Sequence, residues 1–202
     1  MTINEGQKPL ISIIIINHNG KEFLFRCLRS VLETNFRNFE LIFVDNGSCD
    51  GSLDFVRNNF KDERISFVRN DRNYGVPGGR NIGSREAKGE YVVFLDNDTE
   101  VDSSWLDELI KVFQSDSKIA VAQCKLLNMT ERGRFDHAGD YLTSFGFLSE
   151  RSHQSIDTGQ FDKIEDILNA KGAAAMVRRS VFEDLGRYDD SYFMYLEETD
   201  FC

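Results

Sequence analysis

The sequence contains few of the residues that cross-link or rigidify a chain. Among 202 residues there are 2 prolines, 1 tryptophan and 4 cysteines, and no two cysteines form a Cys-x-x-Cys pair. Cysteines scattered in this way argue against a disulfide framework or a cysteine zinc site, and we expect reduced thiols in a cytoplasmic protein. We expect neither a signal peptide nor an integral membrane segment, because the sequence has no basic leader and no long apolar run. The expected lack of a membrane segment is compatible with peripheral association at the inner face of a membrane.

The chain also lacks a surplus of positive charge. It contains 24 Lys and Arg against 34 Asp and Glu, which gives a formal net charge of −10. A nucleic-acid-binding protein needs a basic face, so the charge argues against that class. An acidic protein can still bind an anionic diphosphate where a divalent cation bridges the like charges.

One apolar run ends abruptly at two carboxylates. Residues 91–95 are all apolar, and Asp96 and Asp98 follow them one residue apart. A short run rich in Val and aromatics is typical of a strand buried on both faces of a sheet. Ligands bind at the carboxyl edge of an open α/β sheet, and two carboxylates there can hold a hard divalent cation. For the triplet taken alone, a polar turn is the alternative.

Strand and helix patterns alternate over the first 124 residues. We expect strands at 10–16, 39–44, 65–68, 91–95 and 119–124, and helices at 21–34, 52–60, 83–88 and 104–113. The alternation predicts an α/β fold with a Rossmann-like, mostly parallel central sheet and helices on both faces. After residue 125 the rhythm breaks, and we expect a helix at 161–168, a last buried strand at 173–177 and a short helix capped by Ser180.

Polar residues follow three of the predicted strands, in the segments 17–20, 45–48 and 96–98. Their convergence on one sheet edge would form a ligand crevice. Asp45 can accept the imide N–H of uracil or thymine, or a ribose hydroxyl, and a helix cap or turn is its alternative role. Asn17 and Asn19 can line the base pocket, whereas His18 has no partner at metal-ligand spacing.

The glycine-rich stretch 73–83 precedes a predicted helix. Glycines such as Gly78 let the backbone approach a ligand, and a helix N-terminus favours negative charge. From this loop Arg80 can reach a phosphate or the base. The stretch is not a Walker loop, and no Gly-x-Gly-x-x-Gly follows the first strand, which argues against a dinucleotide oxidoreductase. A tight turn whose glycines serve packing is the alternative.

A second acidic cluster contains Glu197, Glu198 and Asp200, preceded by the apolar residues 193–196. Burial near other carboxylates would raise a carboxyl pKa and suit a general base. The alternative is a solvated acidic helix start. For the pair at 136–137 we favour a structural role over contact with a metal or an acceptor.

Taken in order, these motifs resemble those of the inverting family 2 glycosyltransferases of the GT-A fold. The resemblance spans nearly the whole chain and is greatest to the rhamnosyltransferase-like branch. The matching segments are 13–20 (IIIINHNG), 44–52 (VDNGSCDGS), 73–83 (NYGVPGGRNIG), 93–98 (VFLDND), 172–179 (GAAAMVRR) and 186–202 (GRYDDSYFMYLEETDFC).

The resemblance implies a role for each matching position. Asp45 would hold the pyrimidine base, Asp96 would contact the ribose or a metal-bound water, and Asp98 would ligate Mn²⁺ or Mg²⁺. Where the family usually has Glu-Asp, this chain has Glu197-Glu198, which places Glu198 at the position of the base. Glu197 and Asp200 are alternatives for that role. The other implied nucleotide-sugar contacts are Asn17, Asn19, Gly47, Asn73, Gly78, Arg80, Asn97 and Asp96.

The resemblance also implies an activity. A metal-dependent enzyme would transfer a hexosyl or rhamnosyl group from a UDP- or dTDP-sugar to a hydroxyl of a saccharide or lipid-linked acceptor, in bacterial cell-surface polysaccharide synthesis. One GT-A domain would span 1–202, with a nucleotide-sugar-binding half at 1–124 and an incomplete acceptor half at 125–202. A nucleotide-sugar-binding domain without transferase activity is the main alternative. A sugar-phosphate nucleotidyltransferase fits less well, because no glycine-rich loop with Arg and Lys follows the first strand. A receiver-like signalling domain also fits less well, because such domains are shorter than this chain.

Overall fold

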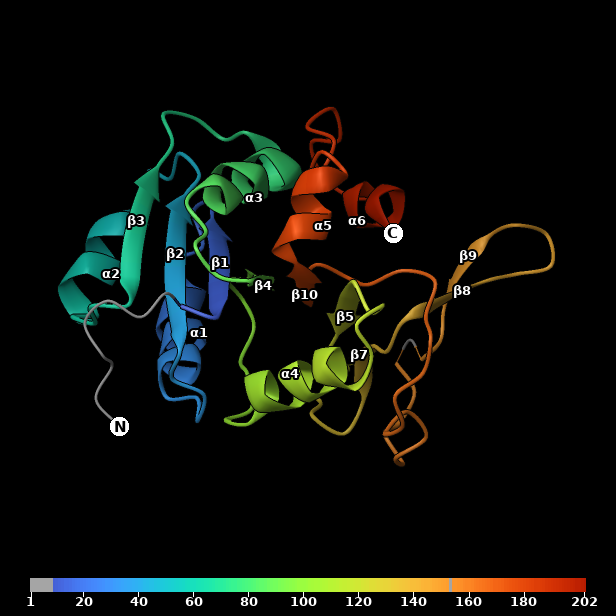
Figure 1. The fold of residues 1–202 in the computed structure, drawn as a ribbon. Helices are drawn as coiled ribbons and strands as arrows, with labels where there is room; N and C mark the ends of the chain where they lie inside the picture. The colour runs from blue at the N-terminus through green and yellow to red at the C-terminus, as the bar shows by residue number, and fades with distance from the viewer. Residues whose placement is uncertain (1–8, 153) are drawn as a thin grey trace.

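The computed structural model describes residues 9–152 and 154–202, and its centre is a six-stranded sheet (Figure 1). The strand order is β3-β2-β1-β4-β10-β5. Parallel pairing joins β1 (Ile11–Asn17), β2 (Phe39–Asp45), β3 (Ile65–Arg69) and β4 (Tyr91–Asp96). Strand β10 (Ala174–Arg178) is antiparallel to both its neighbours, β4 and β5 (Val121–Gln123). The predicted mostly parallel α/β sheet is therefore confirmed.

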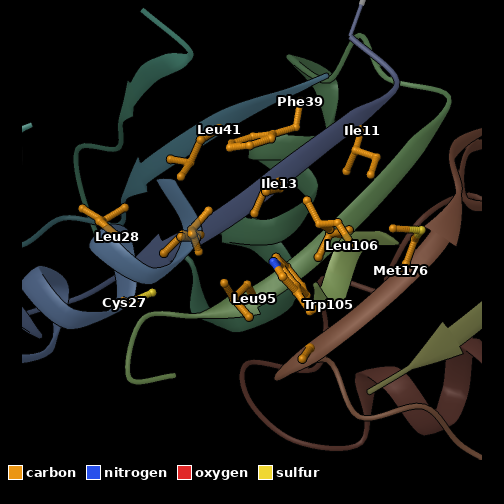
Figure 2. Packing of buried hydrophobic residues seen from close by; sticks show 14 of the residues in the cluster. Ile11, Ile13, Cys27, Leu28, Phe39, Leu41, Leu95, Trp105, Leu106 and Met176 are labelled. Atoms are coloured by element: carbon orange, nitrogen blue, oxygen red, sulfur yellow. The ribbon is translucent and has the colours of Figure 1, made fainter. Parts of the chain in front are cut away.

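Helices cover both faces of this sheet (Figure 1). They are α1 (Lys21–Leu32), α2 (Ser52–Asn59), α3 (Gly75–Arg85), α4 (Trp105–Ser115), α5 (Arg179–Asp184) and α6 (Glu197–Phe201). Because side chains alternate along a strand, β1 supplies both layers. Ile11, Ile13 and Ile15 pack in the cluster that includes α1, α2 and α4, part of which Figure 2 shows. Ile14 points to the opposite layer, where α3, α5 and α6 lie.

The C-terminal half adds two small antiparallel pairs. Strand β6 (Leu126–Leu127) pairs with β7 (Phe135–His137), and β8 (Asp140–Leu142) pairs with β9 (Leu148–Glu150) in a hairpin that projects from the body (Figure 1). Within residues 9–152 and 154–202, no helix has both the length and the apolar character needed to span a bilayer.

The helix predicted at 161–168 is wrong. Phe161 packs edge-on against Phe135, with ring centroids 5.3 Å apart, but Ile164 is 75% exposed. The apolar residues therefore share no buried face, and the segment follows an irregular path in which the Leu168 N–H donates to the Asp140 carbonyl. A helical spacing of apolar residues stabilises a helix only where tertiary packing covers one side.

Other predicted boundaries also shift. The stretch 73–83 is largely helical, since α3 begins at Gly75. Strand β5 is shorter than predicted, and Ser180 lies inside α5, which follows Arg178 rather than a serine cap. Neither α2 nor α4 has a side-chain hydrogen bond from its cap residue, although Asp50 Oδ1 accepts the Ser52 N–H at 2.9 Å.

Gly83 lets α3 lie directly on the sheet. A Cβ atom at this position would lie 2.7 Å from Ile14 Cγ2 and 2.9 Å from Val44 Cγ2. We expect Gly83→Ala to lower the free energy of unfolding by about 1–2 kcal/mol, because overpacking outweighs the better helix propensity of alanine. Urea unfolding measures the change. Gly133→Ala is the control, since its Cβ meets nothing within 4 Å, and equal stability of the two variants would contradict the packing argument.

Candidate functional site

The register of the central strands places three polar strand ends side by side. Asn17 pairs with Asp45 across β1 and β2, and Ile16 pairs with Asp96 across β1 and β4. Asn97 Nδ2 donates to Asn17 Oδ1 at 2.6 Å, and Asn17 Nδ2 donates to Ser48 Oγ at 3.1 Å. The structure thus brings together the three strand ends at the predicted edge.

Asp45 is hydrogen-bonded to two residues, Ser48 and Asn70, that line a surface hollow. Its side chain is buried, and its Oδ1 accepts the Ser48 N–H at 3.3 Å. The hollow has a volume of about 370 Å³ and is lined by Gly47, Ser48, Arg69, Asn70 and Asp71. At Gly47, φ is +76° and a Cβ would lie 2.5 Å from the backbone of Arg72, so glycine is required for this turn.

A larger hollow of about 480 Å³ lies elsewhere, around Asn19, Lys21, Asp50 and Phe55. Asn19 mainly shapes the neighbouring loop, since its Oδ1 accepts the Cys49 N–H at 2.8 Å. The adjacent His18 Nδ1 lies 3.0 Å from the Asn46 carbonyl. The smaller hollow borders the carboxyl ends of β2 and β3, and Asp45 is the last residue of β2.

Asn46 organises the loop before α3, a role that the sequence did not reveal. Its Oδ1 accepts the Asn70 Nδ2 donor and the Tyr74 N–H, at 2.9 and 3.2 Å. Its Nδ2 donates to Asn73 Oδ1 and to the Gly75 carbonyl, at 2.9 and 3.0 Å. Asn73 therefore holds the loop rather than facing open space. The buried Asn46 was visible in the sequence only as the first residue of an Asn-Gly turn.

The N-terminus of α3 is covered by the segment before α6. The Phe193 carbonyl accepts the Val76 N–H at 2.9 Å and lies directly against Gly75. Gly78 is buried, and a Cβ there would lie 3.0 Å from the Tyr74 side chain. This helix end thus meets a carbonyl of the same chain, and Gly78 serves packing, in contrast to the expected approach to an anion.

Arg80 lies at the centre of the site and is 3% exposed. Its Nη2 donates to Asp96 Oδ1 and to the Gly172 carbonyl, both at 2.9 Å, and its Nη1 lies 3.1 Å from Glu198 Oε1. Glu197 Oε1 lies 3.3 Å from the same Nη1. Although burial lowers the pKa of Arg80, the charge of Asp96, followed by other neighbours, raises it above the usual value. Arg80 thus binds protein carboxylates instead of reaching toward a phosphate or base.

The three C-terminal carboxylates differ in their surroundings. Glu198 is partly exposed, and its Oε1 also accepts the Gly172 N–H at 3.1 Å. Glu197 is 2% exposed, and its Oε2 has no hydrogen-bond partner within the described part of the chain. Burial, and then the charge of Glu198, raises the pKa of Glu197. Asp200 is exposed. Glu198 is therefore the carboxylate that combines access to solvent with fixed geometry.

Asp98 faces solvent beside like charges. Partial desolvation of its carboxylate, then the charges of Asp96 and Asp136, raises the pKa of Asp98. No three His, Cys, Asp or Glu side chains form a metal cage among residues 9–152 and 154–202. Two carboxylates without a complete cage fit a cation such as Mg²⁺, which takes one or two protein carboxylates and completes its shell with water and phosphate oxygens.

The arrangement of sheet and helices is that of the GT-A glycosyltransferases. A mannosyltransferase from Pyrobaculum calidifontis, solved with GDP-Man and Mn²⁺, superposes with a TM-score of 0.70 at 18% identity, covering 97% of this chain and 51% of that chain. S. aureus TarS 1-349 gives a TM-score of 0.71 at 18% identity, covering 95% of this chain and 53% of that chain.

The chain belongs to glycosyl transferase family 2, whose family model matches residues 12–186. It is 31% identical over 192 residues to the O-antigen biosynthesis protein RfbC of Myxococcus xanthus, covering 91% of this chain and 15% of that protein. It is 38% identical over 89 residues to the Escherichia coli UDP-Glc:alpha-D-GlcNAc-diphosphoundecaprenol beta-1,3-glucosyltransferase WfaP, covering 44% of this chain and 35% of that protein. The matches thus span less than half the length of either relative.

Proposed function

We propose that this chain is the catalytic part of a metal-dependent, inverting glycosyltransferase that uses UDP- or dTDP-sugars. Its acceptor would be a hydroxyl of a saccharide or lipid-linked saccharide, in the synthesis of a cell-surface polysaccharide. The observation that carries the proposal is the Arg80 cluster. One buried guanidinium contacts both Asp96, at the strand end beside the nucleotide site, and Glu198, the partly exposed carboxylate. Arg80 thereby fixes the position of Asp96, on the donor side, relative to Glu198, the candidate base.

The nucleotide would bind in residues 1–124. Asp45 would accept a hydrogen bond from the base or ribose, beside the hollow that Gly47 borders. Asn17 and Asn97 would line the passage between Asp45 and the Asp96–Asp98 turn, because their side chains bond to each other there. Relatives support a nucleotide-sugar donor, since WfaP is named for UDP-Glc and the mannosyltransferase was solved with GDP-Man.

Asp98, together with Asp96, would hold Mn²⁺ or Mg²⁺. The bound ion would stabilise negative charge on the departing nucleoside diphosphate. Glu198 would accept the proton of the acceptor hydroxyl as its oxygen attacks the anomeric carbon. The Gly172 N–H and Arg80 fix Glu198 Oε1, which leaves Oε2 to take the proton. A single base without a nucleophile suits one displacement with inversion.

Two finer points belong to the same proposal. The order of motifs favours the rhamnosyltransferase-like branch, and hence a dTDP-sugar among the donors. Residues 125–202 would form the acceptor half of a single domain. A binding domain without transferase activity would bind the nucleotide with the same metal dependence and release no sugar, so binding and turnover must be measured separately.

Calorimetric titration of UDP, dTDP and GDP, each with Mn²⁺ and with EDTA, tests the donor site. We expect metal-dependent binding of UDP or dTDP. Binding of GDP alone, or of none of the three, would contradict the proposal. The preferred base would narrow the choice of donor for turnover assays with UDP-glucose, UDP-N-acetylglucosamine and dTDP-rhamnose.

Asp98→Ala is expected to weaken nucleotide binding in Mn²⁺ by at least about tenfold and to leave the affinity in EDTA unchanged, because a ligand of the cation is lost. The same titrations measure both affinities. Asp184→Ala is the control, since it removes one exposed carboxylate from α5, away from the strand ends. If Asp98→Ala binds with unchanged metal dependence, Asp98 does not belong to the metal site.

A further inference from the structure

Four polar side chains form a connected, largely buried chain in the C-terminal half. His137 and Asp140 are 2% and 3% exposed, and His137 Nε2 lies 3.1 Å from Asp140 Oδ1. On one side, Gln123 Nε2 lies 3.1 Å from His137 Nδ1. On the other, Asn169 Nδ2 donates to Asp140 Oδ2 at 2.9 Å. We call these four residues, Gln123, His137, Asp140 and Asn169, the polar chain.

Backbone donors determine the direction of each hydrogen bond in the polar chain. The Lys171 N–H donates to Gln123 Oε1 at 2.6 Å, so the amide nitrogen of Gln123 faces His137. The Gly139 N–H also donates to His137 Nδ1, at 3.2 Å. His137 Nδ1 is therefore an acceptor, and the ring proton on Nε2 is donated to Asp140. A side chain with different donors and acceptors would break this sequence of bonds.

The polar chain holds the segment 169–173 at two points, the Asn169 side chain and the Lys171 backbone. The opposite side of the same segment faces the candidate active site. Gly172 donates its N–H to Glu198 and accepts from Arg80 through its carbonyl, at 3.1 and 2.9 Å. The Ala173 carbonyl accepts the Asp96 N–H at 3.1 Å. The position of this segment therefore affects where Glu198 lies, whereas Asp96 is also held by its pairing with Ile16 in the sheet.

We propose that Gln123, His137 and Asp140 are positioning residues for catalysis, which fix the segment 169–173 and thereby hold Glu198 in place. The inference rests on the proposed function, in which Glu198 accepts the acceptor proton. Burying an imidazole, a carboxylate and two amides is costly, and the cost is not fully offset here because Asn169 Oδ1 has no hydrogen-bond partner among the described residues. Apolar side chains would fill the same space without that cost. One end of the polar chain, Gln123 Oε1, accepts the N–H of Lys171, the residue next to Gly172.

Amide hydrogen exchange tests whether the polar chain holds this segment. His137→Phe keeps a ring of similar size, and Gln123→Met keeps the length of the side chain, so one can replace the other if either fails to fold. We expect exchange at Lys171 and Gly172 to become about tenfold faster in each variant, because the segment loses its anchor. Unchanged exchange at both amides would overturn the proposal.

Thr34→Val is the matched control. Thr34 is fully buried, and its Oγ1 donates to the Ser103 carbonyl at 2.8 Å, so this variant also loses one buried hydrogen bond. It lies at the end of α1, in a part of the molecule without contact to the polar chain. Exchange at Gly172 should match the wild type. Equal acceleration in Thr34→Val would mean that any loss of stability frees the segment, which overturns a specific role.

Turnover separates positioning from general stability. With the sugar nucleotide whose nucleoside diphosphate binds in the titration above, we expect kcat for sugar release to fall about 100-fold in the polar-chain variants, because a base displaced by about 1 Å is misaligned. The affinity for that nucleoside diphosphate with Mn²⁺ should stay within about twofold, since Asp45 and Asp98 are untouched and Asp96 stays paired with Ile16. An equal loss of affinity and kcat would overturn the proposal. If the wild type binds no nucleotide, the proposed function fails, and exchange at Gly172 still decides whether the polar chain holds the segment.

Discussion

Glu198→Gln is expected to lower the rate of sugar transfer by about 10²- to 10⁴-fold while nucleotide affinity stays within about twofold. The amide has the shape of the carboxylate, and its oxygen can still accept from the Gly172 N–H and from Arg80, which both contact Oε1. It has no basic oxygen to take a proton from the acceptor. Release of the nucleoside diphosphate from the sugar nucleotide measures turnover, and calorimetry measures binding.

Asp200→Asn is the control for Glu198→Gln. Asp200 is exposed, and the ion pairs of Arg80 are with Asp96, Glu197 and Glu198, so we expect turnover close to that of the wild type. Turnover that survives in Glu198→Gln and is lost in Asp200→Asn would move the role of base to Asp200. If both variants remain active, the base lies outside this cluster.

Arg80→Met is expected to lower the free energy of unfolding by about 3–5 kcal/mol and to abolish turnover. Methionine keeps an unbranched side chain but leaves Asp96, Glu197 and Glu198 without their shared cation and the Gly172 carbonyl without its donor. Urea unfolding measures the stability change. Arg80→Lys should recover only part of the lost stability. Lysine restores the positive charge, but a single ammonium group cannot reproduce the geometry of two guanidinium nitrogens.

Arg72→Met is the control for the loss of one positive charge. Arg72 lies over the ring of Tyr74, 4.7 Å from its centroid, on an exposed loop. Its replacement should change the unfolding free energy by less than about 1 kcal/mol. If Arg72→Met and Arg80→Met lower the free energy of unfolding by similar amounts, the buried contacts of Arg80 with carboxylates do not account for its contribution to stability.

The strand ends of the site could be predicted from the sequence. Each of the first, second and fourth strands is an apolar run that stops at a polar residue, interrupted only by Ser12 in the first and Glu40 in the second. Neighbouring parallel strands share one carboxyl edge. Asn17, Asp45 and Asp96 therefore had to lie close together, and the register bears this out. Local pattern was enough because the strands that carry these residues are adjacent in the sheet.

The partners of Arg80 could not be predicted in the same way. Glu198 is 118 residues away in the sequence, and the pair depends on how the segment before β10 and the segment before α6 return to α3. Asn46 was missed for a similar reason, since its four bonds reach Asn70, Asn73, Tyr74 and Gly75 in a loop without a regular pattern. At 161–168 the apolar spacing was misleading because Ile164 has no surface to pack against.

The place of β10 in the sheet has a consequence for how the chain is made. Strand β5 pairs with β10, and β10 pairs with β4, so the last strand in the sequence lies between two earlier ones. During synthesis from the N-terminus, β4 keeps an unpaired hydrogen-bonding edge until residues 174–178 leave the ribosome. An open edge next to the apolar run 91–95 is a site for pairing with other nascent chains. The strand that follows Gly172 and Ala173 of the candidate active site is therefore also the one that closes the sheet against aggregation.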